Sequence, residues 1–551
     1  MKSIAKLRVL LLVTLIVVVM PQVPAWGDTT FVSGTIHFNT TWTPAGNPYL
    51  VIGGTRVDTN VVLTILPGVQ MKFNSGIGLT VDGGLSASGT STDSIIFTGN
   101  GVQWAGLNFS SACLQSLCIL EYCTIEGVRG IAVRLDGASP SIVRCNIRNN
   151  SGVVTCGIQI NGGSAPKILY STIELNQTAT GGFSVCGGGI SIAPGASPEI
   201  RGNLIKDNSV YVWGYNNGAS GGGICVSSDS AIIVDNTFVG NSANEVAGGG
   251  TGGAMAVNGA SPLIACNLIS GNGAGVCGGI VISGGSPLIS CNTIAGNTGG
   301  GANGIYYVYG PCEGTPTTVL NNIYSNHDLV NSVFEVYSGL GTCILAMENN
   351  WWATTDPSQI DLLVYDFWDD PTLRKLDFIP FSASANTPPS DSIVVLIPNG
   401  GETWLYDEVH NLRWNPFCYT DNVKLEYSTD GGSHWRVITL NTRNFGLYVW
   451  KVPFAVSTTC RVRVSDASDG IPSDISDNNF TIRPSFVPGD ANGSGSVNIS
   501  DAVYLIAYIF SGGPAPVPLL SGDANCGGSV NISDAVYIIA YIFSGGPAPC
   551  A

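Results

Sequence analysis

Charged side chains are scarce in this chain, and basic ones more so than acidic ones. Only 11% of the 551 residues are Asp, Glu, Lys or Arg, and 38 acidic residues outnumber 22 basic ones. The net charge of −16 argues against nucleic acid as a partner, because nucleic-acid binding needs a basic surface. The sequence also has no Cys-x-x-Cys motif and no cluster of Cys with His, so it offers no zinc-binding pattern.

Long apolar runs are missing after the first residues. A basic start leads into an apolar run from Val9 to Met20, and small residues around Ala25 offer a cleavage site. This pattern predicts that residues 1–27 are a secretion signal, and the run is too short to span a bilayer. We therefore expect a secreted chain, free or held at a cell surface by a partner, with no membrane insertion after signal cleavage. Its 16 cysteines would then form disulfides.

Glycine, by contrast, is abundant, and between residues 130 and 330 it accompanies a repeat. The repeat starts at seven positions spaced 25 to 33 residues apart: Ser139, Ala165, Ser197, Ser230, Ser261, Ser286 and Thr315. Eight residues after each start lies an apolar side chain: Ile147, Ile173, Ile205, Phe238, Ile269, Ile294 and Ile323. Eleven residues after each start lies an asparagine: Asn150, Asn176, Asn208, Asn241, Asn272, Asn297 and Asn326.

Such a period, with three short alternating strands per repeat, predicts the coils of a solenoid. Stacked coils place equivalent residues above one another, so the apolar residues form inward columns. The asparagines then form a structural ladder rather than a row of ligands, because they persist through every coil. The stretch resembles secreted, pectate-lyase-like right-handed parallel β-helix proteins over residues 30–385. That resemblance implies the fold but not an activity.

Residues 393–483 show a different pattern. Several short strands, a hairpin signal at Asp430-Gly431-Gly432 and four tryptophans predict a β-sandwich. The stretch resembles the immunoglobulin- or fibronectin-like spacers of secreted bacterial proteins. We expect it to separate the solenoid from the C-terminal residues 488–551.

The last residues contain a near-identical duplication, 33 positions apart. Each copy places oxygen-bearing residues at the spacing of a calcium loop and runs into an apolar helix. The expected ligands are Asp490, Asn492, Ser494, Ser496 (through its carbonyl), Asn498 and Asp501 in the first copy, and Asp523, Asn525, Ser529, Asn531 and Asp534 in the second. The second copy has Gly527 where the first has Ser494, so it has one ligand fewer.

This duplication resembles a type I dockerin over residues 488–551. The resemblance implies bound Ca²⁺ and a cohesin-type partner, which the family contacts at the tenth and eleventh loop positions. These are Ile499 and Ser500 in one copy and Ile532 and Ser533 in the other. Identical copies are compatible with docking in two orientations.

Several cysteines are placed to form disulfides. Cys526 and Cys550 would pin the C-terminus to the second loop. Cys266 with Cys291 and Cys312 with Cys343 would lie across rungs of the solenoid, and Cys418 with Cys460 could bridge the sandwich.

No catalytic residues emerge from the sequence. Arg148, Glu174 and Lys206 stack nine residues after successive starts, and we interpret them as a solvated charge ladder. The longer connections after Asn176 and Asn208 carry aromatic residues, which would gather at one corner and suit the faces of sugar rings. These candidates for carbohydrate binding are Phe183, Tyr211, Trp213 and Tyr215.

The sequence therefore predicts an exported, modular, carbohydrate-associated protein whose β-helix binds polysaccharide and whose dockerin attaches it to a cohesin. Two alternatives remain open. One is a polysaccharide lyase or glycoside hydrolase that acts in polysaccharide catabolism, delivered by the same dockerin. The other is a structural or adhesive surface protein.

Overall fold

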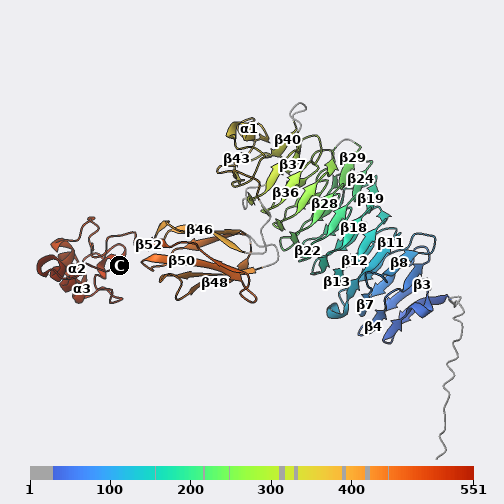
Figure 1. The fold of residues 1–551 in the computed structure, drawn as a ribbon, viewed down its shortest axis with the longest axis horizontal. Coiled ribbons are helices and arrows are strands. Elements are labelled where there is room, and N and C mark those ends of the chain that lie inside the picture. The colour runs from blue at the N-terminus through green and yellow to red at the C-terminus, as the bar shows by residue number, and fades with distance from the viewer. Residues whose placement is uncertain are drawn as a thin grey trace, which may run out of the picture.

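The computed structural model describes residues 29–155, 157–214, 218–246, 249–308, 317–327, 333–386, 393–415, 422–444 and 446–550. Three bodies follow one another along the chain: a long solenoid of parallel strands, a β-sandwich and a small helical module (Figure 1). This order confirms the predicted fold class, a right-handed parallel β-helix followed by a sandwich and a small helical region. The secretion signal predicted for residues 1–27 lies outside the described residues.

Each full coil of the solenoid contains three strands. The first strands stack into a parallel sheet of 13 strands. They are β2 (Thr40–Trp42), β4 (Val62–Ile65), β7 (Gly84–Ser88), β10 (Ile119–Glu121), β13 (Ser141–Val143), β17 (Lys167–Leu169), β22 (Glu199–Arg201), β27 (Ile232–Val234), β31 (Leu263–Ala265), β35 (Leu288–Ser290), β38 (Thr317–Val319), β41 (Ile344–Ala346) and β43 (Lys375–Asp377).

The second and third strands belong to a continuous sheet of 23 strands, which β1 (Thr30–Ile36) and β3 (Tyr49–Val57) begin. The second strands are β5 (Gln70–Phe73), β8 (Ile95–Gly99), β11 (Cys123–Glu126), β14 (Asn146–Arg148), β18 (Thr172–Glu174), β23 (Leu204–Lys206), β28 (Thr237–Val239), β32 (Leu268–Ser270), β36 (Thr293–Ala295) and β39 (Asn322–Tyr324). The third strands are β6 (Leu79–Val81), β9 (Leu107–Phe109), β12 (Val133–Leu135), β16 (Ile158–Ile160), β21 (Ile190–Ile192), β26 (Ile224–Val226), β30 (Met255–Asn258), β34 (Ile280–Ser283), β37 (Ala302–Tyr307), β40 (Phe334–Tyr337) and β42 (Val364–Tyr365).

Apolar columns fill the solenoid interior. Ile147 pairs with Ile173 on the next coil and Ile173 with Ile205, and all three are fully buried. Because strand residues alternate between the two faces, every second residue of each short strand joins a column. Each buried isoleucine contributes about 1.5–3 kcal/mol relative to an exposed one. The solenoid is therefore held together by the repeat that the sequence displays.

The predicted asparagine ladder is confirmed. Along its seven residues, each Nδ2 donates to the Oδ1 of the next coil over 2.8–3.0 Å. The ladder ends at the buried carboxylate of Glu335, which accepts from the Asn326 backbone amide and side chain. All rungs are buried away from water, so each asparagine side chain supplies the hydrogen bonds that the asparagines of the adjacent coils need.

A second ladder runs five residues earlier in each coil and was not predicted. It joins Asn203, Asn236, Asn267, Asn292, Asn321 and Asn350 through Nδ2–Oδ1 bonds of 2.9–3.0 Å. In the two preceding coils Ser171 and Cys145 take the same place, since the Cys145 amide donates to Ser171 and the Ser171 amide donates to Asn203. The two ladders support the two turns that flank the second strands.

The connections after the first ladder build a further parallel sheet at one corner of the solenoid. Its five strands are β15 (Ser151–Gly152), β19 (Gln177–Thr180), β24 (Ser209–Val212), β29 (Ser242–Glu245) and β33 (Gly273–Ala274). The labels β19, β24 and β29 lie in a row along one edge of the solenoid (Figure 1). The lengthened connections therefore gather at one corner, as the sequence predicts.

The sandwich packs a three-stranded sheet against a six-stranded one around Trp404, Trp414 and Trp450. The smaller sheet contains β44 (Val394–Ile397), β46 (Val409–Asn415) and β49 (Leu447–Lys451). The larger contains β45 (Thr403–Leu405), β47 (Asn422–Ser428), β48 (Arg436–Arg443), β50 (Ser457–Asp466), β51 (Ser473–Ile475) and β52 (Phe480–Arg483).

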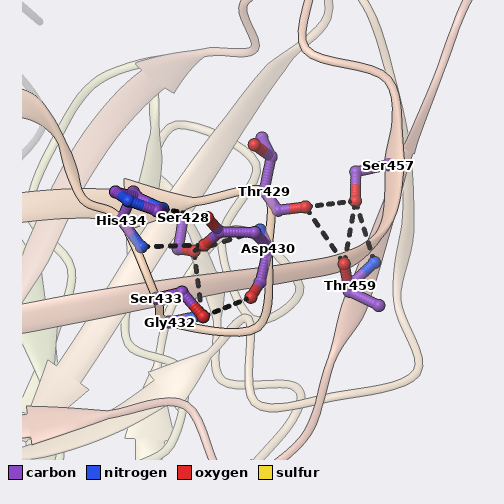
Figure 2. Close-up of polar contacts among 8 residues, drawn as sticks. All are labelled: Ser428, Thr429, Asp430, Gly432, Ser433, His434, Ser457 and Thr459. Atoms are coloured by element: carbon purple, nitrogen blue, oxygen red, sulfur yellow. Dashed lines mark hydrogen bonds and ion pairs between the residues drawn. The ribbon is translucent and has the colours of Figure 1, made fainter.

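The predicted hairpin joins β47 to β48 at Asp430-Gly431-Gly432, where both glycines have positive φ. The Asp430 carboxylate accepts from the His434 amide at 2.9 Å, from Ser428 Oγ at 2.7 Å and from His434 Nδ1 at 2.6 Å (Figure 2). These bonds hold the pKa of Asp430 well below its usual range, and the His434 amide is the largest cause. The cluster closes a turn, which is a structural role.

The C-terminal module consists of two helices of equal length, α2 (Ile499–Ser511) and α3 (Ile532–Ser544), which contact each other. Each begins with a capping box, formed by Asn498 with Asp501 and by Asn531 with Asp534. Each ends at a glycine in the left-handed conformation, Gly512 or Gly545. The duplication in the sequence is therefore a duplication of structure.

Candidate calcium loops and aromatic surfaces

The first loop of the C-terminal module folds around two buried carboxylates. Asp490 accepts from the backbone amides of Ser494 at 2.9 Å and Gly495 at 2.6 Å. Asp501 is fully buried and accepts from the amides of Asn492 at 3.1 Å and Asn498 at 2.9 Å. Gly495 has a φ of 87°, so the turn that brings these amides inward requires glycine.

The other predicted ligands bring further oxygens into the same loop. Ser494 Oγ lies 3.4 Å from Asp490 Oδ1 and 3.2 Å from the Ser496 carbonyl oxygen. The Asn498 side chain contacts that carbonyl at 3.2 Å. Two buried carboxylates with hydroxyl and carbonyl oxygens are the donors that a hard divalent cation prefers. Buried carboxylates without a cation are costly, so this donor set fits Ca²⁺.

The second loop repeats this geometry with one oxygen fewer. Asp523 accepts from the amides of Gly527 and Gly528, and Asp534 from those of Asn525 and Asn531, all over 2.8–3.1 Å. The Asn531 side chain contacts the Ser529 carbonyl at 2.9 Å. Gly527 offers no side-chain oxygen, so the two loops share a frame but differ in ligand count.

The predicted disulfide between Cys526 and Cys550 is present and ties the C-terminus to this second loop. Cys266 is disulfide-bonded, but Cys291 is a buried thiol, so the predicted bridge between these two was wrong. Cys343 is also disulfide-bonded, and its pairing with Cys312 stays a prediction. Cys312 and Cys418 lie outside the described residues. Cys460, the predicted partner of Cys418, is a buried thiol whose Sγ lies 3.5 Å from the Ser457 carbonyl oxygen, so that predicted bridge was wrong.

Both helices of the module expose a row of apolar side chains, which we call the apolar stripes. On α2 the stripe is Ile499, Val503, Ile506 and Phe510, with exposures of 38–68%. On α3 it is Ile532, Val536, Ile539 and Phe543, with exposures of 36–69%. The spacing of four, three and four residues places each row on one helix face. The predicted partner residues Ile499 and Ile532 begin the two stripes, and Ser500 and Ser533 beside them are exposed.

At the solenoid corner, alternate residues of β24 point outward. Val210 and Val212 are fully buried, whereas Tyr211 is 41% exposed and Trp213, just after the strand, is 52% exposed. Their ring centroids lie 6.5 Å apart. The Trp213 indole occupies the space where a Cβ on Gly181 would project, so the glycine lets the ring lie flat on the neighbouring coil. We call Tyr211 and Trp213 the corner platform.

The other two predicted carbohydrate-binding residues are less closely placed. Phe183 is 45% exposed in the connection between β19 and β20 (Val185–Cys186), and Tyr215 lies outside the described residues. A disulfide between Cys186 and Cys225 fastens this connection to the outer face of β26. Sequence reasoning missed this bridge, because the two cysteines occupy different positions in their coils.

The charged groups that drew attention in the sequence form local pairs. Arg148 pairs with Glu126 at 3.0 Å, and Lys206 pairs with Glu174 at 2.9 Å, as expected for a charge ladder. His327 Nδ1 lies 2.6 Å from the buried Glu335 carboxylate, beside the end of the first asparagine ladder.

In the described part of the chain, no helix is long and apolar enough to cross a bilayer.

The fold and its paired loops define a class, a parallel β-solenoid followed by a small module that contains the same oxygen-rich loop and helix twice. Two families match within the chain: the right-handed beta helix region over residues 68–238 and the dockerin type I domain over residues 488–543. The chain thus carries a β-helix and a C-terminal type I dockerin, which confirms both resemblances. No curated protein and no solved structure matched.

Proposed function

We propose that this is an extracellular, carbohydrate-associated protein that its dockerin attaches to a cohesin-type partner. The observation that carries the proposal is the duplicated module, whose two identical helix starts and apolar stripes are exposed together. Exposed apolar patches of this kind mark interaction surfaces. Dockerin type I domains bind calcium, attach to cohesins and are typically extracellular, and the family match supports these roles here.

Calcium is the proposed cofactor, and both loops are its proposed sites. In the first loop the side chains of Asp490, Asn492, Ser494, Asn498 and Asp501 and the Ser496 carbonyl would hold the ion. Asp523, Asn525, Asn531 and Asp534 would act with the Ser529 carbonyl in the second. When bound, Ca²⁺ neutralises the buried carboxylates and fixes the N-termini of α2 and α3, which present the apolar stripes.

A pair of charge substitutions tests the docking surface. Val503→Asp places a carboxylate in the middle of the first stripe and Val536→Asp does so in the second. If either copy can dock, each single variant retains binding to a panel of type I cohesins, measured by calorimetry with calcium, and the double variant loses it. Val449→Asp, at an exposed valine of the sandwich, is the matched control. Full binding by the double variant would contradict the proposal.

The corner platform is the proposed polysaccharide surface of the β-helix. Aromatic faces combine apolar area with polar edges and so suit sugar rings, and the platform is rigid because Trp213 lies on the coil below. Trp213→Ala should reduce retention of the whole protein in gels that contain polysaccharide. Phe38→Ala, at an exposed aromatic residue elsewhere on the solenoid, should not. Equal retention of both variants would remove the platform as a glycan site.

A further inference from the structure

Three tyrosines stack on the outer face of the last coils, and we call them the tyrosine ladder. Tyr306 of β37, Tyr337 of β40 and Tyr365 of β42 occupy equivalent register positions. The ring centroids of Tyr306 and Tyr337 lie 4.7 Å apart with planes 6° from parallel, and those of Tyr337 and Tyr365 lie 5.5 Å apart at 16°. The stacked rings thus form one continuous wall along the solenoid axis.

A groove of about 630 Å³ runs beside this wall. Phe334 extends the aromatic side, where its ring lies 5.0 Å from that of Tyr365. The opposite side consists of Val276 and the glycines at 275, 300 and 301, which belong to the corner turns of two coils. A Cβ on Gly301 would lie 3.5 Å from the Tyr306 ring, so the groove exists because this turn has no side chain.

We propose that this groove binds a neutral polysaccharide, with the glycan chain lying along the tyrosine ladder. The proposal rests on the carbohydrate role proposed above but uses different residues. The stacked rings and Phe334 offer apolar area, and the tyrosines add a row of phenol hydroxyls at the spacing of the coils. This combination contacts both the C–H groups and the hydroxyls of successive sugars. The glycines of the two corner turns carry no side chain, so the glycan can approach the protein backbone there.

The charge around the groove selects neutral over acidic glycans. The described residues that line the groove are all uncharged, so a uronate finds no cation to pair with among them. Asp366 follows Tyr365 directly and is buried, and Asp361 and Asp369 lie close to it. Burial and these two neighbouring carboxylates raise the pKa of Asp361, so three acidic side chains lie close together on the last coil. A polyuronate would be repelled.

Two substitutions of different kinds test the groove in the full chain. Tyr337→Ala removes the middle of the ladder, and Gly301→Leu fills the groove without removing an aromatic ring. Tyr324→Ala changes a half-buried tyrosine of the same coil as Tyr337, on the second strand β39, and serves as the control. The probes are the neutral polymers hydroxyethyl cellulose, xyloglucan and galactomannan, and polygalacturonate as the acidic one. Retardation in polysaccharide gels gives the affinity, and thermal melting checks that each variant is folded.

The expected result is retardation by at least one neutral polymer, weakened about tenfold in both groove variants and unchanged in the control, with no retardation by polygalacturonate. Binding to polygalacturonate alone, or equal retention in the folded groove variants and the original protein, would overturn the inference. Trp213→Ala separates it from the proposed function. If Trp213→Ala abolishes binding and Tyr337→Ala does not, the corner platform stands and the groove fails. The converse result leaves the groove as the glycan site and removes the platform.

Discussion

The solenoid and the dockerin both arise from sequence repetition, but they use it in opposite ways. In the solenoid the repeated isoleucines and asparagines are buried and contact their own copies on the next coil. In the dockerin the repeated apolar stripes are exposed and point away from the core that the two helices share. The same pattern in a sequence therefore stabilises a fold when it is buried and presents a recognition surface when it is exposed.

This difference follows from the number of copies and their geometry. Stacked coils bring each copy within strand spacing of the next, so identical side chains can bond to one another. Two helices that pack together have room for only a small core, here centred on Leu505 and Ile538, and the remaining apolar residues stay outside. If they form the proposed docking surface, two copies provide two equivalent surfaces for one partner.

Calcium removal should have the largest effect, and only on the dockerin. A site at 1,000 times its Kd in free calcium stabilises the folded module by about 4 kcal/mol. Chelation should therefore lower the melting transition of residues 488–551 steeply, whereas the transition of the solenoid stays in place. Scanning calorimetry of the whole chain, with and without a chelator, measures both. A dockerin transition that does not move would refute the metal assignment.

Breaking a buried rung should have the next largest effect. In Asn241→Ala, the Asn208 amide and side chain lose their buried acceptor. The Asn272 oxygen loses the side-chain donor of residue 241 and keeps only the backbone amide of that residue. Unsatisfied buried groups cost about 1–3 kcal/mol each, so we expect a loss of about 3 kcal/mol. Denaturant unfolding measures it.

The control for that rung is Asn244→Ala, an exposed asparagine of the same coil, which should change stability by less than about 0.5 kcal/mol. Similar losses for the two variants would mean that burial does not distinguish the ladder from the surface. The contrast between the two regions would then fail.

Exchanging one residue between the calcium loops should have a smaller effect. Ser494→Gly gives the first loop the ligand count of the second and should weaken its calcium affinity about tenfold, near 1.4 kcal/mol. Gly527→Ser should strengthen the second loop, once the Asn525 side chain shifts to admit the new Cβ. Calorimetric titration of the two reciprocal variants measures both changes. Unchanged affinities would show that water replaces the serine without loss.

Features that repeat at a fixed offset could be read from the sequence. The first asparagine ladder, the isoleucine columns and the two calcium loops all recur in register, so periodicity alone placed them. The second asparagine ladder repeats over six coils but gives way to Ser171 and Cys145 in earlier ones, and it was missed. Where other residue types occupy some of its positions, a column is hard to recognise in the sequence even though it is continuous in the structure.

The tyrosine ladder shows why the rest could not be predicted. Tyr306 and Tyr337 lie at unequal distances from the repeat starts Ser286 and Thr315, and Tyr365 lies beyond the last recognisable repeat, so no fixed offset links the three. Their neighbouring positions follow from strand pairing in coils of unequal length. The Cys186–Cys225 disulfide could not be predicted for the same reason, since it joins a corner connection to the face of a strand.

The smallest effect should come from a polar cluster that is not repeated at all, the hairpin around Asp430. The His434 amide, Ser428 and the His434 ring lower the pKa of this carboxyl in the folded state. Its stabilising contribution is therefore present above its unfolded pKa of about 3.9 and is lost as the pH falls through the lower folded value. The original protein should exceed Asp430→Asn in stability at neutral pH, and this difference should become smaller as the pH falls below about 3.9. Unfolding of both at pH 7 and pH 3 measures this, and a pH-independent difference would show that the ionised carboxylate does not hold the turn. Because the cluster belongs to the sandwich and is not a repeated feature, the loss of stability should be confined to the sandwich. The melting of the solenoid should be unchanged.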